Sequence, residues 1–194
     1  MTIEFPVSEA HLTALRESLA DRADLGGDLG VAYRTLDTPL GALLLAATER
    51  GLVRVAFERE EFDRVLETLA ERVSPRILRA PGRLDEAVRE LEEYLTGRRT
   101  RFDLHLDHAL SSGFRGEVHR HLPEIGYGRT ASYAEVAALA GRPRAVRAVG
   151  TACGTNPLPI VVPCHRVVRS DGSAGGYLGG PEAKAYLLRL EGAA

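Results

Sequence analysis

The spacing of apolar side chains changes from helical to strand-like at about residue 31. Before that point, leucines recur at helical intervals behind Ser8, which predicts a capped amphipathic helix over residues 8–22 and then a linker over 24–30. After it, short β-rich runs alternate with turns. These runs predict a three-stranded antiparallel meander with strands at residues 31–36, 40–47 and 52–57.

Two helical periodicities follow the meander, at residues 61–73 and 84–95, and Gly97 ends the second. Residues 101–106 then alternate between apolar and polar side chains, which favours a further strand beside the meander. Together these elements predict a small α+β unit that ends near Asp107.

The second half of the chain is helical and rich in small residues, beginning with a predicted helix over residues 114–122. Further on, Ser132 and Glu135 have the spacing of a capping box, and two short helices separated by a glycine turn follow, at residues 133–140 and 144–153. This arrangement is typical of a helix-turn-helix. Helix pairs with such turns are common and most bind nothing, so DNA binding needs further support.

The second helix of this pair has little side-chain bulk. Around Arg147 stand three small residues, Ala145, Ala148 and Gly150. A helix with so thin a face can approach DNA closely, and Arg147 could reach a phosphate, a base edge or an empty position in the base stack. The same small residues would equally permit close packing of helices, and the sequence leaves both interpretations open.

Net charge separates the two halves. The whole chain has 25 basic and 27 acidic residues, a net charge of -2 that by itself argues against a polyanionic partner. Residues 1–107 hold 15 basic and 21 acidic residues (net -6), whereas residues 108–194 hold 10 and 6 (net +4). A negatively charged ligand would therefore prefer the second half. Between residues 130 and 170, Glu135 is the single acid beside five arginines: Arg142, Arg144, Arg147, Arg166 and Arg169.

The number of cysteines and the length of the apolar runs indicate in which cellular compartment the protein is expected. Two cysteines cannot build a disulfide framework, and the N-terminus has neither a basic-then-apolar leader nor a small-residue cleavage site. The longest apolar runs fall far short of the ~20 residues that cross a bilayer. We therefore expect a cytoplasmic protein with no membrane segment.

The richest chemistry lies in the run from Pro159 to Val168, where Cys164, His165 and Arg166 interrupt β-branched residues. The apolar context predicts rigid, buried, extended backbone. A buried cysteine is by default an inert core residue, which suits Cys153 but fits Cys164 poorly, since thiolates are favoured by adjacent cationic or hydrogen-bonding groups.

Neighbouring side chains point in different directions, so we expect a water to link His165 to the Cys164 sulfur. An acid such as Glu191 would orient the imidazole from the other side. Two cysteines eleven residues apart with one histidine give too few ligands for zinc, so no metal is expected.

These residues carry a resemblance to a known family. The segment 163–167 (PCHRV), the pair Asn156-Pro157 and the stretch 147–150 before it, and Gly176-Tyr177 and the segment 190–192 after it, resemble the O6-alkylguanine-DNA alkyltransferases, or methylated-DNA–protein-cysteine methyltransferases. The resemblance covers roughly residues 31–192. It implies an α+β protein with an N-terminal helical extension (1–30), an α+β domain (31–107), and a mostly helical DNA-binding and alkyl-acceptor domain (108–194).

The resemblance also implies catalytic roles. Cys164 would accept the alkyl group from guanine O6, with His165 acting through water as its base and Glu191 holding the imidazole. Tyr133 would give a proton or hydrogen bond to guanine N3, and Lys184 would assist near O6.

Binding roles follow in the same way. Backbone groups of Cys164 and Val167 would read the exocyclic amine, the Leu178 N–H would face O6, and Tyr177 would line the substrate pocket. Asn156 would brace the turn between the recognition helix and an active-site strand. Arg147 would fill the gap left by a flipped nucleotide, on a DNA-contacting surface that further comprises Ala145, Ala148, Gly150 and Arg166.

The implied function is direct, single-turnover repair of O6-alkylguanine in double-stranded DNA by a monomer without a cofactor, with O4-alkylthymine left open as a second substrate. Three alternatives remain: a thiol hydrolase using Cys164, His165 and Asn156; a dimeric helix-turn-helix regulator with a redox-sensing cysteine; and a protein that only flags alkylated bases. The last of these would not need the thiol of Cys164.

Overall fold

The alternating run after residue 31 folds into the predicted meander. In this computed structural model, which describes residues 8–193, strands β1 (Val31–Thr38), β2 (Gly41–Thr48) and β3 (Gly51–Phe57) pair antiparallel in sequence order. A fourth strand, β4 (Ile77–Arg79), runs parallel to β1, so the sheet order is β3-β2-β1-β4. Three residues behind Ser74 and Pro75 carry no periodic signal, and the sequence did not predict this strand.

The strand expected at residues 101–106 is wrong. This segment forms only one isolated bridge, between Leu106 and Leu52 of β3. The Leu52 N–H donates to the His105 carbonyl at 2.9 Å, and the Asp107 N–H donates to the Leu52 carbonyl at 2.8 Å. These two hydrogen bonds, which flank Leu106, take the place of a continuous ladder of strand pairing. The segment then continues into the C-terminal part of the chain.

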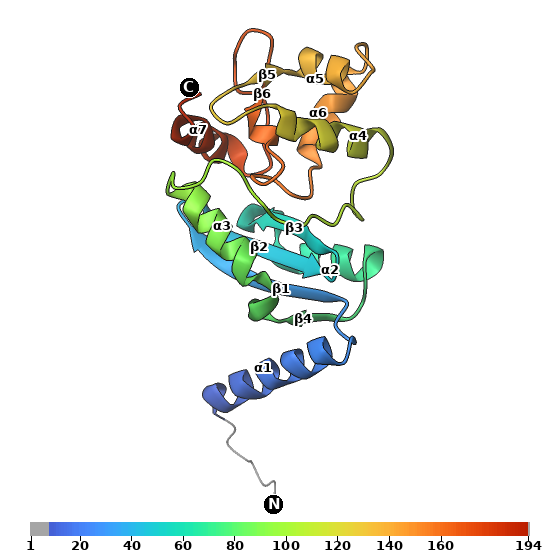
Figure 1. Cartoon of the computed structure of the whole chain (residues 1–194), viewed down its shortest axis with the longest axis vertical. Coiled ribbons are helices and arrows are strands. Elements are labelled where there is room, and N and C mark those ends of the chain that lie inside the picture. The colour runs from blue at the N-terminus through green and yellow to red at the C-terminus, as the bar shows by residue number, and fades with distance from the viewer. Residues whose placement is uncertain (1–7, 194) are drawn as a thin grey trace, which may run out of the picture.

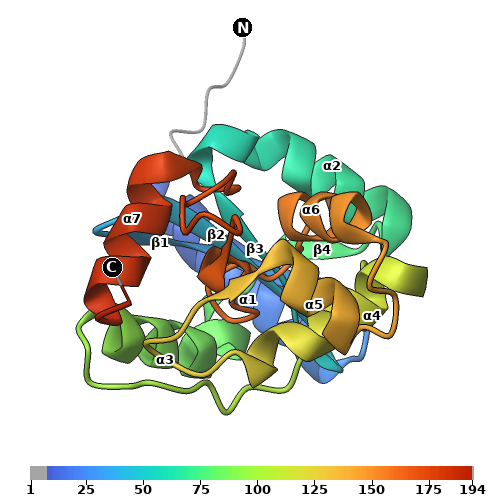
Figure 2. The ribbon, with the colours of Figure 1, turned by 90° about the horizontal axis from the view of Figure 1, so that it is seen from above.

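Helices cover both faces of the sheet, as Figure 2 shows. Helix α2 (Phe62–Arg72) places Val65 and Leu69 against one face, and α3 (Asp85–Leu95) places Leu91 and other apolar residues against the other. Successive residues of β2 alternate between these two clusters, as the pleat requires. Both helices were predicted within two residues at either end.

The N-terminal helix α1 (Glu9–Leu25) confirms a helix behind Ser8, whose hydroxyl accepts a hydrogen bond from the His11 N–H at 3.2 Å, but the expected apolar face is not buried, since Leu15 and Leu19 are exposed. It extends three residues beyond the predicted end, into the expected linker. Ala20 packs against Leu29, Ala32 and Ala80, which fixes α1 at the end of the molecule remote from α5 and α6 (Figure 1).

The C-terminal part is mostly helical, as predicted. Its elements are α4 (Gly113–His121), β5 (Ala131–Ser132), α5 (Tyr133–Leu139), α6 (Val146–Gly154), β6 (Val167–Val168) and α7 (Gly180–Leu190). The capping box is confirmed, since the Glu135 N–H donates to Ser132 Oγ at 3.2 Å and the Ser132 N–H donates to Glu135 Oε2 at 2.6 Å. Helices α5 and α6 are the predicted helix pair.

Cys164 does not lie on the extended strand that the β-branched run predicted. It begins a single 3₁₀ turn, η4 (Cys164–Arg166), directly after an inverse γ-turn in which Pro163 has φ -81° and ψ 61° and the Cys164 N–H donates to the Val162 carbonyl at 2.8 Å. The strand β6 starts only after the turn and pairs in parallel with β5. Because β5 leads into α5, this pairing sets the cysteine turn beside the first residue of the helix pair.

The two parts share one apolar core. The main cluster of buried residues runs from the α3 face of the sheet into α4, α5, α6 and the turn that holds Cys164. At the junction, the Val55 N–H of β3 donates to the Pro157 carbonyl at 2.9 Å. In the part of the chain that the structure describes, no helix is both long and apolar enough for a membrane span.

Candidate active site

Cys164 is enclosed, with 2% of its surface exposed. Its sulfur accepts a hydrogen bond from Asn156 Nδ2 at 3.1 Å. Burial raises the pKa of the thiol to about 11, although the Asn156 hydrogen bond and the charge of Lys184 act in the opposite direction. At neutral pH the sulfur is therefore a thiol, and a nucleophilic role requires a base.

Asn156 holds the cysteine turn in shape, as expected from the sequence. Its side chain is fully buried, and Nδ2 also donates to the Val162 carbonyl at 2.8 Å, while Oδ1 accepts from the Leu158 N–H at 3.0 Å. One amide group thus fixes the backbone on both sides of the loop after α6 and points a donor at the sulfur.

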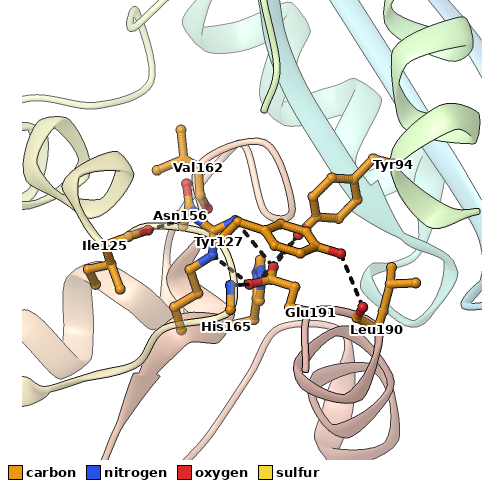
Figure 3. A network of polar contacts seen from close by, with 10 residues as sticks. Tyr94, Ile125, Tyr127, Asn156, Val162, His165, Leu190 and Glu191 are labelled. Atoms are coloured by element: carbon orange, nitrogen blue, oxygen red, sulfur yellow. Dashed lines mark hydrogen bonds and ion pairs between the residues drawn. The ribbon is translucent and has the colours of Figure 1, made fainter. Parts of the chain in front are cut away.

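His165 points toward the end of α7, where Glu191 lies. Its Nε2 lies 2.6 Å from Glu191 Oε1, as Figure 3 shows. Burial lowers the pKa of the imidazole, so the ring is neutral at pH 7 and Nε2 carries the proton that the carboxylate accepts. Nδ1 is buried and has no hydrogen-bond partner among residues 8–193. Its lone pair is the available base, and no hydrogen bond joins His165 to the Cys164 sulfur in this part of the chain.

Glu191 is the acceptor around which the site is built. Burial tends to raise the pKa of this carboxyl, but the hydrogen bonds from His165, Arg166 and Tyr94 outweigh it and lower the pKa to about 2. The Gly128 N–H donates to Oε2 at 3.1 Å, and the hydroxyl of Tyr94 donates to Oε1. The carboxylate is therefore ionised and held from four sides.

Arg166 corrects a sequence-based expectation. It was predicted to contact DNA, yet it is 6% exposed, and its Nε and Nη2 donate to Glu191 at 2.9 and 3.2 Å. Its Nη1 donates to the Ile125 carbonyl at 2.6 Å. The 3₁₀ turn directs this side chain inward, where it neutralises the buried carboxylate, so it adds no charge to the surface.

Lys184 of α7 is fully buried beside the cysteine turn. Its Nζ donates to the Val167 carbonyl at 2.5 Å, and burial lowers the pKa of the ammonium. The Val167 N–H in turn donates to the Cys164 carbonyl. The backbone groups of Cys164 and Val167 that were expected to read a base edge are thus fixed by the turn and by Lys184.

Tyr133 is the first residue of α5 and is half-buried, and burial raises the pKa of its hydroxyl. Gly175 lies directly against it: a Cβ at that position would stand 2.7 Å from the Tyr133 hydroxyl oxygen, and its φ of +64° suits glycine. The segment after β6 therefore lies over the tyrosine that leads α5.

Tyr177 and Leu178 belong to the same segment. The Tyr177 ring packs edge-on against Phe57 of β3, with centroids 5.6 Å apart, and against His165, with centroids 6.2 Å apart. Leu178 is half-buried and lines a cavity together with Asn156 and Arg54. Tyr177 thus contacts the cysteine turn through His165, and Leu178 lies near the loop that holds Asn156.

The outer face of α6 bears on the question that the sequence left open. Arg147 and Ala148 are exposed and Ala145 and Gly150 are half-exposed, while the inner face buries Val149, Ala152 and Cys153. A Cβ added at Gly150 would meet nothing within 4 Å. The small residues therefore do not serve close packing of helices, and they leave Arg147 on a thin, open surface.

Two contributors escaped prediction from the sequence. Tyr94 of α3 reaches the site from the N-terminal part, 97 residues before Glu191. Arg54 of β3 donates to the Pro157 carbonyl at 3.2 Å, next to Asn156. Each lies in a periodic element whose sequence indicates ordinary core or surface, so only their spatial neighbours reveal them.

No group of three or more His, Cys, Asp or Glu in residues 8–193 could hold a metal ion.

The fold and the site define a class: proteins in which an α+β unit supports a helical unit that places a buried cysteine, next to a histidine paired with a glutamate, beside a helix-turn-helix. Comparisons with known proteins agree. Residues 31–108 match the family described as 6-O-methylguanine DNA methyltransferase, ribonuclease-like domain, and residues 113–193 match 6-O-methylguanine DNA methyltransferase, DNA binding domain. The chain belongs to the 6-O-methylguanine DNA methyltransferase family.

Relatives with established names support this assignment. The methylated-DNA–protein-cysteine methyltransferase of Methanosarcina barkeri is 39% identical over 82% of this chain and 96% of its own length. The bifunctional transcriptional activator/DNA repair enzyme Ada of Escherichia coli is 37% identical over 96% of this chain but 54% of its own length. The crystal structure of Mycobacterium tuberculosis OGT in complex with DNA matches with a TM-score of 0.70 and 39% identity, over 83% of this chain and 92% of the other.

Proposed function

We propose that this protein repairs O6-alkylguanine in double-stranded DNA by moving the alkyl group to the sulfur of Cys164, once per molecule. The observation that carries the proposal is the buried thiol with Asn156 on its sulfur and a neutral imidazole, oriented by Glu191, one residue away. Membership of the 6-O-methylguanine DNA methyltransferase family supports the same chemistry.

The charges balance over these residues. The thiol proton passes through a water to His165 Nδ1 while the sulfur attacks the alkyl carbon in line and the carbon–O6 bond breaks. The electron pair of that bond stays on the purine, which takes a proton at N3 from Tyr133 and leaves neutral. Glu191 stabilises the imidazolium, which returns its proton to solvent, and the Tyr133 phenolate takes one proton back from solvent, so both groups end neutral. The product is a thioether, and the described site contains no second nucleophile directed at it.

The base must leave the duplex for this reaction. Guanine O6 lies inside the stack, so we propose that α6 enters the minor groove with its thin face and that Arg147 fills the gap left by the flipped nucleotide. The exposed small residues around Arg147 support this geometry. Binding should weaken with added salt, because phosphate contacts release counterions.

Work is divided among the three expected segments. In the proposed division, residues 108–194 bind DNA and carry out the transfer, residues 31–107 support the site, and residues 1–30 have no part in the chemistry. We further propose a cytoplasmic monomer. One chain supplies every group of the reaction, and both cysteines are free thiols, which suits a reducing compartment.

A thiol hydrolase is the rival reaction at this site. It would need a direct Cys–His contact, whereas the Cys164 sulfur is hydrogen-bonded to Asn156.

A single experiment distinguishes alkyl transfer from hydrolysis. The protein is incubated with a duplex that contains one O6-methylguanine, and intact and peptide masses are measured. We expect a gain of one methylene on the Cys164 peptide, at one per molecule, and no gain in Cys164→Ala. Multiple turnover, or DNA binding without a mass change, would overturn the proposal.

A further inference from the structure

A tyrosine of the N-terminal part is built into the alkyl-acceptor site. Tyr94 lies in the last turn of α3, is fully buried, and donates its hydroxyl proton to Glu191 Oε1. Its oxygen also stands 3.4 Å from His165 Nε2. In Figure 3 the side chain of Tyr94 enters from α3, opposite the end of α7 that carries Glu191.

Packing fixes the ring in this place. Tyr94 stacks at a tilt on Phe102, with centroids 4.8 Å apart, and meets Tyr127 edge-on at 6.0 Å. Burial and the charge of Glu191 raise the pKa of its hydroxyl far above the usual range. The hydroxyl therefore stays protonated and acts as a donor at every pH at which the protein works.

Apart from Arg166, which donates to both, the two oxygens of Glu191 have different partners. Oε2 accepts from Arg166 Nε and the Gly128 N–H, both within the C-terminal part. Oε1 accepts from His165 Nε2 and Arg166 Nη2, and here Tyr94 adds its proton from outside that part. The oxygen that orients the imidazole is thus the one that the N-terminal part holds.

We propose that Tyr94 is a positioning residue for alkyl transfer, which acts on His165 through Glu191 and makes the efficiency of the site depend on docking of α3. The proposal rests on the proposed reaction at Cys164. By sharing Oε1, the hydroxyl removes part of the negative charge that the imidazolium would feel, and it keeps the carboxylate in the plane that the imidazole requires.

Loss of the hydroxyl has two consequences. The imidazole is held less firmly, so the transfer slows, and it faces a less neutralised carboxylate, so it binds a proton at higher pH. The other groups around His165 remain in place: Arg166 on η4, Lys184 on α7, the Tyr177 ring, Cys164 and Glu191 itself. The shift is therefore attributable to the one hydroxyl.

The test compares Tyr94→Phe with Tyr186→Phe in the full chain. Tyr186 is a matched control, because its hydroxyl also joins α7 to α3, donating to the Leu95 carbonyl at 3.3 Å without touching Glu191. Transfer rates are measured against pH with free O6-benzylguanine and with an alkylated duplex. For Tyr94→Phe we expect about a tenfold slower transfer on both substrates, which corresponds to a rise of about 1.4 kcal/mol in the activation free energy. The acid limb of the pH profile, where the rate falls as the pH is lowered, should move to higher pH. Tyr186→Phe should keep the wild-type rate and limb.

A second variant covers the case in which Tyr94→Phe does not fold. Replacement of Tyr94 by 3-fluorotyrosine keeps the ring and makes the hydroxyl a stronger donor, so the acid limb should move to lower pH. An unchanged limb in either Tyr94 variant, or an equal change in Tyr186→Phe, would refute the positioning role. Failure of the wild-type protein to gain mass at Cys164 would instead refute the reaction itself.

Discussion

Cys164 and His165 divide the work of the site in a way that follows from burial alone. Burial raises the pKa of the thiol to about 11 and lowers that of the imidazole, so both groups rest in their neutral forms. An enclosed thiolate would be reactive and costly to desolvate, whereas a neutral pair creates charge only when the proton moves toward Nδ1 and Glu191 stabilises it. A resting thiol thus gains its nucleophilicity at the moment of transfer.

This arrangement predicts a level pH profile for the transfer to Cys164. The rate with free O6-benzylguanine should fall only as the pH drops through the pKa of His165, which lies below the usual 6.5 because burial disfavours the charged ring. Above that it should stay level up to about pH 10. If a pre-formed thiolate with a pKa of about 11 were the nucleophile, the rate would instead rise about tenfold per pH unit across this range. Stopped-flow or quenched-reaction rates distinguish the two.

Single residues could be predicted where reactive side chains stand within an otherwise apolar run. A polar trio in an apolar run identified Cys164 and His165, the need for an acid to orient the imidazole suggested Glu191, and the resemblance implied the same residue. Tyr94 was hidden because a tyrosine at core spacing in α3 gives no sign of a partner 97 residues away. Arg166 was assigned to the DNA-contacting surface together with the other arginines that make residues 130–170 basic. Its inward direction depends on a 3₁₀ turn that the β-branched run did not predict.

Helix α6 is the element whose surface matters most for DNA. Its inner face builds core and its outer face carries Arg147 among small residues, so the same helix can be tested for folding and for recognition separately. Elements with caps or long periodic runs, such as α5 with its capping box, were predicted well. The three-residue β4 and the single bridge at Leu106 were not, since their pairing partners lie far away in sequence.

Substitutions on α6 should affect the transfer rate with duplex DNA differently from the rate with the free base. We expect Arg147→Ala to slow transfer from an alkylated duplex by about 10- to 100-fold, since the wedge offsets an unstacking cost of a few kcal/mol, and to leave transfer from free O6-benzylguanine unchanged. Arg144→Ala removes the same charge just before the helix and should cost far less. Equal losses on both substrates would remove the proposed role of Arg147.

Bulk on the same face provides an independent measurement. Ala148 is exposed, so Ala148→Leu should change the free energy of unfolding by less than about 0.5 kcal/mol. It should nevertheless weaken duplex binding strongly, because a larger side chain keeps the helix away from the groove. Urea unfolding and fluorescence anisotropy with a labelled duplex give the two values. Unimpaired binding would show that this face does not approach DNA.

At the scale of the whole molecule, the N-terminal part supports the cysteine turn at three places. Tyr94 holds Glu191, Phe57 packs on Tyr177, and Arg54 pins the loop after α6. Arg54 is mostly buried and paired with Glu60, whose other oxygen accepts from the Phe57 N–H at 2.9 Å. The sheet therefore contacts both the loop of Asn156 and the segment of Tyr177, which lie on either side of Cys164 in the sequence.

Breaking the Arg54 contact should affect the chemistry from a distance. Arg54→Ala leaves Glu60 without its ion-pair partner and removes one hydrogen bond from the Pro157 carbonyl, which keeps the one from the Val55 N–H, so we expect the free energy of unfolding to fall by about 3 kcal/mol. Because the loop next to Asn156 then loosens, transfer should slow equally on free base and duplex, unlike Arg147→Ala. Arg50→Ala removes a mostly exposed arginine from the buried Asp107, which keeps the hydrogen bonds from the Thr48 hydroxyl and the Ala109 N–H, so it should cost less than Arg54→Ala and leave the rate unchanged. If Arg54→Ala lost stability but kept its full transfer rate at a temperature where it is folded, the sheet would support the fold and not the site.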